Sequence, residues 1–105
     1  MGTFCEIFGN TARLKVLEIF LECQESDFPL SFVAEDTGLS RAITYSVCEK
    51  LLKEKYIVPT RVIASAQLYK LNVQKLEVKV LIKTMNAIIH MIAEEYQEKE
   101  IVVKR

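Results

Sequence analysis

The stretch GLSRAITYSVCEKLLKEKYIV, residues 38–58, begins as a turn, continues as a helix and ends in β-branched residues. Gly38 suits the left-handed position that follows a helix, and Ser40 can cap the next one. We therefore expect two helices meeting at a sharp angle, the second running from Ser40 to about Lys55. Its residues at positions i, i+3, i+4 and i+7 form one stripe suited to a core: Thr44, Val47, Cys48 and Leu51.

The side chains on the opposite face of this helix are mostly short or able to form hydrogen bonds. It consists of Arg41, Ala42, Tyr45, Ser46, Glu49, Lys50 and Lys53. Such a face can approach a groove of duplex DNA closely, where an arginine can pair with guanine and the tyrosine and serine can reach bases or phosphates. Ile43, at its border, could touch a thymine methyl group or complete the core. The alternative is an ordinary solvated helix face.

The segments before this stretch predict two more helices. Asn10 can cap a helix from Thr11 to about Cys23, whose apolar residues give a broad buried face. The connection QESDFPL, residues 24–30, contains a proline and a short extended piece at 28–30. The segment SFVAEDT, residues 31–37, then forms a short helix that ends at Gly38.

Two β-prone runs follow the helix, Tyr56–Arg61 and Gln67–Leu71, and VIASA, residues 62–66, separates them. They predict a β-hairpin. Although the chain has a formal net charge of zero, residues 40–72 carry six basic and two acidic side chains. A locally basic surface can attract phosphate because screening limits the electrostatic field to about 8 Å at physiological salt.

This order of elements resembles two families of bacterial and archaeal regulators. VAEDTGLSRAITYSVCEKLLKEKYIV, residues 33–58, is similar to the MarR-type pattern, and FGNTARLKVLEIF (8–20) and LYKLN (68–72) resemble the first helix and second wing strand of ArsR-type repressors. The resemblance implies a mainly α fold with a small β-hairpin (α+β): a winged helix-turn-helix core over residues 7–72 of a single domain, 1–105.

The resemblance also implies a function, that of a sequence-specific regulator of transcription that binds double-stranded DNA. Helix 40–55 would enter the major groove and hairpin 56–71 would be the wing. The implied DNA-binding residues are Ser40, Arg41, Ala42, Tyr45, Ser46, Lys50, Arg61, Gln67 and Lys70. The sequence departs from the family pattern in two places. VIASA lacks the usual basic residue of a wing tip, and Lys55 stands where the families often have glycine.

The last third of the chain predicts a long helix, because residues 73–100 contain no proline or glycine. At 1.5 Å per residue it would be roughly 42 Å long, leaving a tail at 101–105. Alternating spacings of four and three indicate a coiled-coil seam for a homodimer: Val78, Ile82, Met85, Ile89, Ile92 and Tyr96. A second apolar surface comprises Leu76, Val80, Leu81, Ile88 and Met91. The alternative is a helix lying wholly on its own core.

Other chemistry has less support in the sequence. His90 and Glu94 could share a metal ion, but the chain has one histidine and three widely spaced cysteines (Cys5, Cys23 and Cys48), so we expect no metal site and no cofactor. A disulfide involving Cys5 or Cys23 stays an alternative. No motif for catalysis is found, so we expect no enzyme.

Without a signal peptide or an unbroken apolar segment we expect a cytoplasmic protein with no membrane contact. The sequence leaves open whether a small-molecule effector exists. The rival function is a winged helix that binds another protein within a larger assembly, since fold does not decide between the two.

Overall fold

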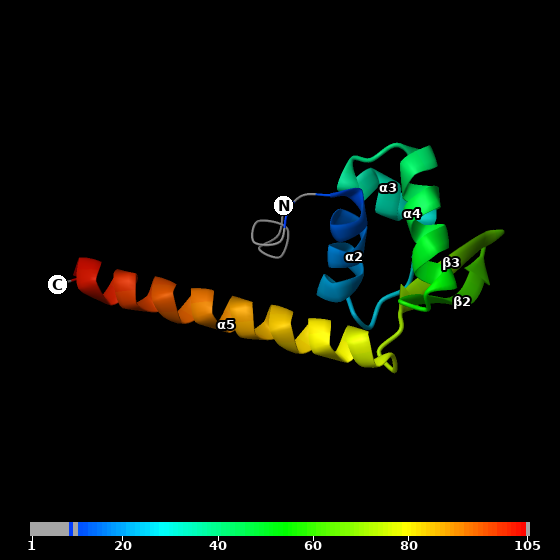
Figure 1. Cartoon of the computed structure of the whole chain (residues 1–105). Helices are drawn as coiled ribbons and strands as arrows, with labels where there is room; N and C mark the ends of the chain where they lie inside the picture. The colour runs from blue at the N-terminus through cyan, green and yellow to red at the C-terminus, as the bar shows by residue number, and fades with distance from the viewer. Residues whose placement is uncertain (1–8, 10, 105) are drawn as a thin grey trace.

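The computed structural model describes residues 9 and 11–104, with side chains up to residue 95. The order of elements is helical at both ends with a small sheet between, an α+β architecture as expected (Figure 1). The elements are α2 (Ala12–Glu22), β1 (Phe28–Pro29), α3 (Leu30–Thr37), α4 (Arg41–Lys53), β2 (Ile57–Ile63), β3 (Ala66–Leu71) and α5 (Leu76–Lys104).

The N-terminus of α2 is capped by a threonine. The Thr11 hydroxyl oxygen accepts a hydrogen bond from the Leu14 backbone N–H at 3.2 Å, which satisfies one of the free N–H groups of the first turn. Thr11 therefore takes the capping position that the sequence suggested for Asn10, which lies outside the described residues. The helix then runs to Glu22, one residue short of the predicted end.

The turn between α3 and α4 has the predicted chemistry. Gly38 adopts φ 75°, and its N–H donates to the Ala34 carbonyl oxygen at 3.0 Å, closing α3. The Ser40 hydroxyl oxygen accepts from the Ile43 N–H at 3.2 Å and opens α4. Both helices are thus fixed by local hydrogen bonds on either side of a three-residue turn, which sets the angle of α4 against α3.

The C-terminus of α4 ends at Lys53 rather than Lys55 because the chain turns there through a left-handed residue. Lys55 has φ 65°, its N–H donates to the Leu52 carbonyl at 3.1 Å, and the Tyr56 N–H donates to the Leu51 carbonyl at 2.9 Å. This pair of bonds is a Schellman motif. Lys55 therefore adopts the conformation for which the resembled families use glycine, at a cost of about 1–2 kcal/mol.

The sheet has the strand order β1-β3-β2, with both pairs antiparallel. Phe28 lies opposite Tyr69 and Ile57 opposite Leu71. The predicted five-residue connection is wrong: the strands continue to Ile63 and Ala66, leaving a two-residue turn. Both turn residues have positive φ, the conformation of the tight turns that match strand twist.

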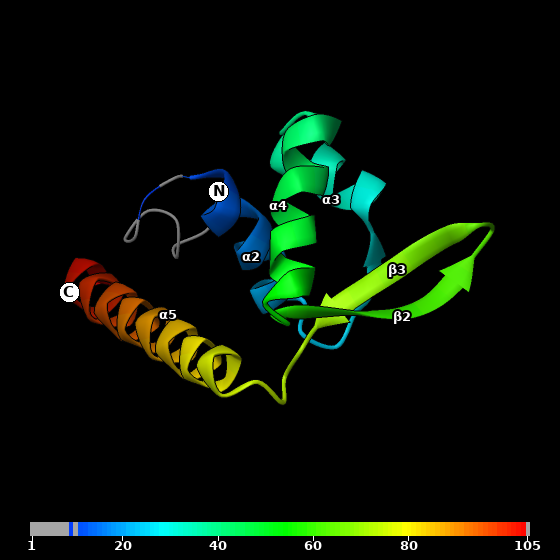
Figure 2. The same cartoon turned by 45° about the vertical axis from the view of Figure 1, so that its right-hand side comes forward.

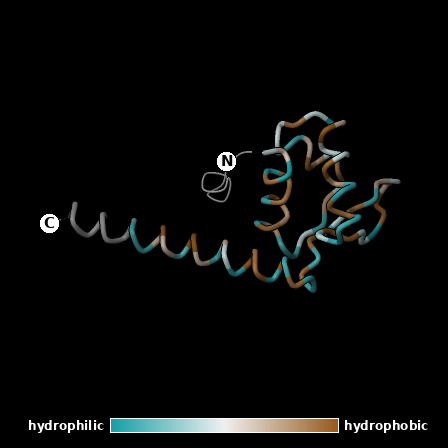
Figure 3. The backbone as a smooth tube through the Cα atoms, viewed as in Figure 1, coloured by the Kyte–Doolittle hydropathy of each residue, from teal (hydrophilic) through white to brown (hydrophobic). Residues whose placement is uncertain are grey.

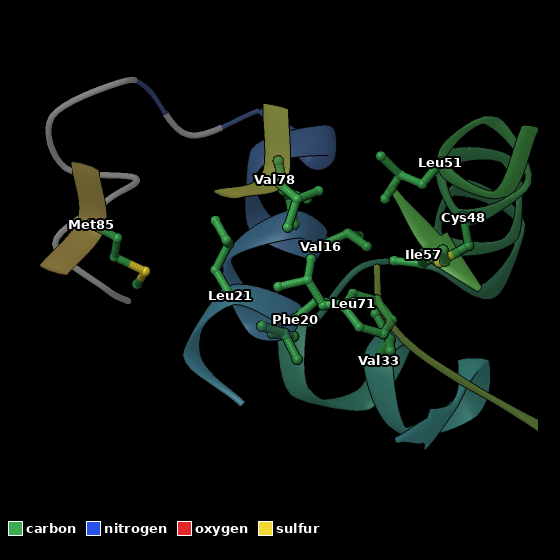
Figure 4. Packing of buried hydrophobic residues seen from close by; sticks show 12 residues of the cluster. Val16, Phe20, Leu21, Val33, Cys48, Leu51, Ile57, Leu71, Val78 and Met85 are labelled. Atoms are coloured by element: carbon green, nitrogen blue, oxygen red, sulfur yellow. The ribbon is translucent and has the colours of Figure 1, made fainter. Parts of the chain in front are cut away.

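The core lies between α2, the inner faces of α3 and α4, the base of the hairpin and the start of α5 (Figure 4). Phe20 of α2 is fully buried in this core, and so is Val78, which α5 contributes. The predicted stripe of α4 faces this core, with Val47 half-buried and the other three residues buried. The main buried contributors are Val16, Leu21, Val33, Cys48, Leu51, Ile57 and Leu71.

Helix α5 runs past the rest of the chain (Figures 1 and 2). It begins at Leu76, not residue 73, because the Asn72 side-chain oxygen accepts from the Gln74 N–H at 3.2 Å and holds a turn there. It continues to Lys104, so residues 101–104 are helical rather than a tail, in keeping with the absence of glycine and proline. Within the described part of the chain, no helix has the length and apolar character needed to cross a membrane.

The predicted seam of α5 divides into two parts. Val78 and Met85 are buried and partly buried Ile82 packs against the same cluster, so this proximal part contributes to the chain's own core rather than to an exposed seam. Ile89 is 49% exposed and Ile92 is also exposed, beyond the body of the domain. The side chain of Tyr96 lies outside the described residues. Figure 3 shows apolar residues recurring along the coloured part of α5.

Candidate nucleic-acid interface

The outer face of α4 is open along its length. Ser40, at the N-cap, and all five helix residues expected to contact DNA are exposed: Arg41, Ala42, Tyr45, Ser46 and Lys50. Among the described residues no carboxylate lies within ion-pairing distance of Arg41 or Lys50. Ile43 is 48% exposed, which places it on this face rather than in the core. The face therefore offers free cations, hydroxyl groups and one aliphatic side chain.

The inner face holds α4 in place. Thr44 and Cys48 are fully buried, and the Thr44 hydroxyl has no hydrogen-bond partner among the described residues. Burial raises the pKa of the Cys48 thiol to about 11, because a thiolate would lose its hydration there. Cys48 is consequently an uncharged packing residue, unlike Cys23, which is exposed. Cys5 lies outside the described residues.

The wing arginine is engaged within the molecule. Arg61 Nε donates to Asp27 Oδ2 at 2.9 Å and Nη2 donates to Oδ1 at 3.2 Å, while the Thr60 hydroxyl donates to Oδ2 at 2.7 Å. These bonds hold the pKa of Asp27 down, to about 2, and the hydrogen bonds to Asp27, together with its negative charge, raise the pKa of Arg61. Arg61, expected to flank the wing against DNA, instead ties the wing to the connection between α2 and β1.

A strand irregularity explains how one carboxylate binds two consecutive side chains. The pairing of β2 with β3 shifts between Pro59 and Val62, so two residues of β2 oppose one residue of β3. In a β-bulge of this kind the strand bends and side chains are re-aimed. Here the bulge directs the side chains of Thr60 and Arg61 to the same side, where Asp27 receives them.

The two other predicted wing residues differ from each other. Gln67 is half-buried, and its amide nitrogen donates to the carbonyl oxygens of Arg61 at 3.1 Å and Leu68 at 3.0 Å. It therefore braces the hairpin. Lys70 is half-buried, with no carboxylate of the described residues in ion-pairing range, so its ammonium group can meet an outside anion.

A shallow hollow of about 210 Å³ joins the outer face of α4 to the hairpin. Tyr45 lines it from α4, and Gln67 and Tyr69 line it from β3. Its remaining lining residues are Pro29, Leu30, Ser31 and Ala66. The helix face and the wing predicted from separate parts of the sequence therefore adjoin, as parts of one surface.

The structure places the metal candidates apart from this surface. His90 Nε2 and Glu94 Oε1 are 3.1 Å apart on the projecting half of α5, and both side chains are exposed. The described residues contain no group of three or more histidine, cysteine, aspartate or glutamate side chains that could hold a metal ion.

Asp27 is the residue of this surface that the sequence did not reveal. It lies in the polar connection QESDFPL, where an acidic residue looks like any solvated loop residue. Its partner is 34 positions away, and only the pairing of β1 with β3 brings the two segments together. The one feature of the sequence that hinted at this contact is the absence of a basic side chain at the wing tip. That absence left the role of the nearby Arg61 open.

No protein-family model matches the sequence, and no curated protein is significantly similar to it. Solved structures do match. A possible transcriptional regulator from Methanosarcina mazei has a TM-score of 0.58 and 15% identity over 90% of this chain and 82% of its own. Reduced HlyU from Vibrio cholerae has a TM-score of 0.60 and 19% identity over 75% of this chain and 77% of its own.

A third match is the homodimeric winged helix-turn-helix DNA-binding domain of Mb0332 from Mycobacterium bovis, described as a possible ArsR-family regulator. Its TM-score is 0.55 and its identity 19%, over 85% of this chain and 73% of its own. At this level of identity the likeness shows the fold. The chain has the winged helix-turn-helix fold, with α3 and α4 as the helix-turn-helix and β2–β3 as the wing.

Proposed function

We propose that this chain is a homodimeric regulator of transcription that binds double-stranded DNA in a sequence-specific manner. The observation that carries the proposal is the outer face of α4, where Arg41 and Lys50 are exposed and unpaired among the described residues beside exposed Tyr45 and Ser46. The fold also lays this face beside the wing. The kinship of fold with DNA-binding regulators supports the proposal.

In this proposal α4 enters the major groove with its first two turns. Ala42 has a small side chain, so the helix backbone can approach the base edges closely. Arg41 donates to the O6 and N7 atoms of guanine, the commonest specific contact of an arginine. Ser46 and Tyr45 reach bases or phosphates, and Ile43, now known to be exposed, can contact a thymine methyl group.

The wing makes fewer phosphate contacts than the sequence suggested. Lys70 remains a candidate for a backbone phosphate, whereas Arg61 is neutralised by Asp27. Phosphate contacts position a protein on the duplex and base contacts specify the sequence. In this proposal the base contacts that give sequence specificity come from α4. The wing contributes to DNA binding mainly through side chains other than Arg61.

The dimer is proposed to form through the projecting half of α5. Ile89 and Ile92 lie on the same helical stripe as buried Val78 and Met85, but beyond the part that the domain covers. An exposed aliphatic stripe of this kind favours burial against the same stripe of a second copy of the chain. A two-fold dimer would present two copies of α4 to half-sites about one helical turn apart.

Selection of bound sequences from a random duplex pool, followed by titration of the enriched duplex at several salt concentrations, tests the proposal. We expect a recurrent, near-palindromic motif and a log-log salt slope of about −0.9 per phosphate contact. Recovery of no common sequence, or an affinity independent of salt, would contradict it and favour the rival function, a winged helix that binds another protein.

A further inference from the structure

The tip of the wing is apolar and open to solvent. Val62 is 62% exposed and Ile63 is 48% exposed, directly before the two-residue turn Ala64–Ser65. In the part of the chain that the structure describes, no element covers more than about half of either side chain, although β-branched aliphatic side chains usually contribute to a strand by packing against a neighbour. The tip therefore presents two branched hydrocarbon groups at the end of a narrow hairpin.

The polar side chains next to the tip are bonded within the molecule, although the Arg61 side chain stays 63% exposed. Arg61 is held by Asp27 at 2.9 Å, and the Gln67 amide donates to two carbonyl oxygens of the hairpin itself. Ser65 is the one polar side chain left at the turn. Hence residues 62–65 of the tip carry no cationic side chain, and Val62 and Ile63 are the large aliphatic side chains that the tip exposes.

The direction of the tip is fixed. The bulge between Pro59 and Val62 bends β2, and the bonds that Thr60 and Arg61 donate to Asp27 fasten that bend to the connection before β1. The hairpin projects beyond α4, on the side away from the C-terminal end of α5 (Figure 2). Because the hollow lined by Tyr45 and Gln67 is continuous with both elements, the tip extends the same surface as the outer face of α4.

We propose that Val62 and Ile63 contact the minor groove of the duplex, inserting aliphatic side chains at a deformable base step where other wings place a basic side chain. This inference rests on the proposed DNA-binding function. Proteins that bind the minor groove use aliphatic wedges to unstack a base step, and the duplex bends as a result. Pyrimidine–purine steps deform most easily, so the wing selects a flexible step flanking each half-site. Continuity with the proposed major-groove face favours DNA over a protein as the occupant.

The test compares the full-length chain with the double variant Val62→Thr/Ile63→Thr on the duplex enriched by selection. Threonine keeps the β-branched shape, so the hairpin is retained while aliphatic carbons are lost. The matched control is Val80→Thr, the same exchange at an exposed position of α5. Affinity, its salt slope and the bend angle from end-to-end fluorescence transfer are measured for each protein.

We expect the double variant to bind roughly tenfold more weakly and to lose the bend, with its salt slope unchanged because no phosphate contact is removed. The control should match the wild type. Replacing adenine by 2,6-diaminopurine at the flanking step adds an amino group to the minor groove alone, and it should weaken the wild type but not the double variant.

Three results would count against the inference. Equal affinity and bending for the wild type and the double variant would overturn it and leave the tip to a protein partner. A reduced salt slope in the double variant, with the bend retained, would show a phosphate contact instead of a wedge. If the wild type bound no duplex at all, the proposed function itself would fail, an outcome distinct from the other two.

Discussion

The two halves of α5 carry the same apolar repeat and have different surroundings. Val78 and Met85, in the half next to the body, are buried, whereas Ile89 and Ile92, in the projecting half, are exposed. All four lie on one helical stripe. The difference shows that periodicity identifies an apolar face, and that the neighbouring elements determine which part of this face the chain itself covers. For the exposed part we propose a second copy of the chain.

The two arginines of the proposed DNA surface, Arg41 and Arg61, also differ in their surroundings. Arg41 on α4 has no acidic partner among the described residues, whereas Arg61 on the wing is bonded to Asp27 through two nitrogens. Both residues look alike in the sequence, as isolated basic residues in a basic segment. Of these two arginines only Arg61 is ion-paired among the described residues, and substitutions can separate the two situations.

The largest effect should come from a charge in the covered half of α5. Val78→Glu would bury an unpaired carboxylate where Val78 is fully buried, and we expect a loss of about 3–5 kcal/mol in the free energy of unfolding. Val80→Glu is the control, since Val80 is exposed two positions later. Urea unfolding measures both variants, and equal losses would show that the two surfaces of α5 do not differ.

The second effect concerns the projecting half. Ile89→Glu should leave the fold intact and dissociate the dimer, so that light scattering reports the chain mass of 12.1 kDa rather than twice that value. Affinity for a full palindrome should fall about a hundredfold more than affinity for a half-site, through loss of linkage. Asn86→Glu, an exposed neighbour off the stripe, should stay dimeric. A wild-type mass of 12.1 kDa would refute the dimer.

A smaller effect should separate the two arginines. Arg41→Ala should cost about 1–3 kcal/mol on the selected duplex and little on random duplexes, because a base contact is lost. Arg61→Ala should leave the salt slope nearly unchanged, since its charge is already paired. Lys70→Ala should weaken all duplexes alike and reduce the slope by about one. Equal weakening of selected and random duplexes by Arg41→Ala would remove its role as a base reader.

The smallest effect concerns pH. Because the bonds from Arg61 and Thr60 lower the pKa of Asp27 from 3.8 to about 2, its contribution to stability is complete above pH 4 and is lost as the pH falls through 2. The carboxyl carbon resonance of Asp27 should titrate near pH 2 in the wild type. In Arg61→Gln it should titrate closer to pH 4, and an unchanged midpoint would show that the arginine bond does not lower the pKa.

Most of the fold could be predicted from the sequence because local rules determine it. The glycine after α3, the serine before α4 and the stripe of α4 depend on contacts within a few residues, and all three were confirmed. The length of the hairpin turn was wrong because Ala64 and Ser65 are unusual in the left-handed conformation. Nothing in their identity distinguishes them from the remainder of VIASA.

The candidate site was located less completely. The exposed positions of α4 follow from helical period, which the sequence displays directly. The roles of Arg61 and Gln67 could not be read in the same way, because hydrogen bonds to Asp27 and to strand carbonyl groups depend on sheet pairing and on a bulge. A bulge re-aims side chains locally, so the strand period alone does not reveal that Thr60 and Arg61 both face Asp27.

The sequence by itself determined the order of elements, the capped turn and the two faces of α4, since each depends on hydrogen bonds and periodicities that span a few residues. Tertiary structure alone decided which half of α5 is core, which arginine is free and where the apolar wing tip points. Those outcomes depend on contacts between segments distant in sequence, such as Asp27 with Arg61 and α2 with α5. Their geometry exists only after the chain has folded.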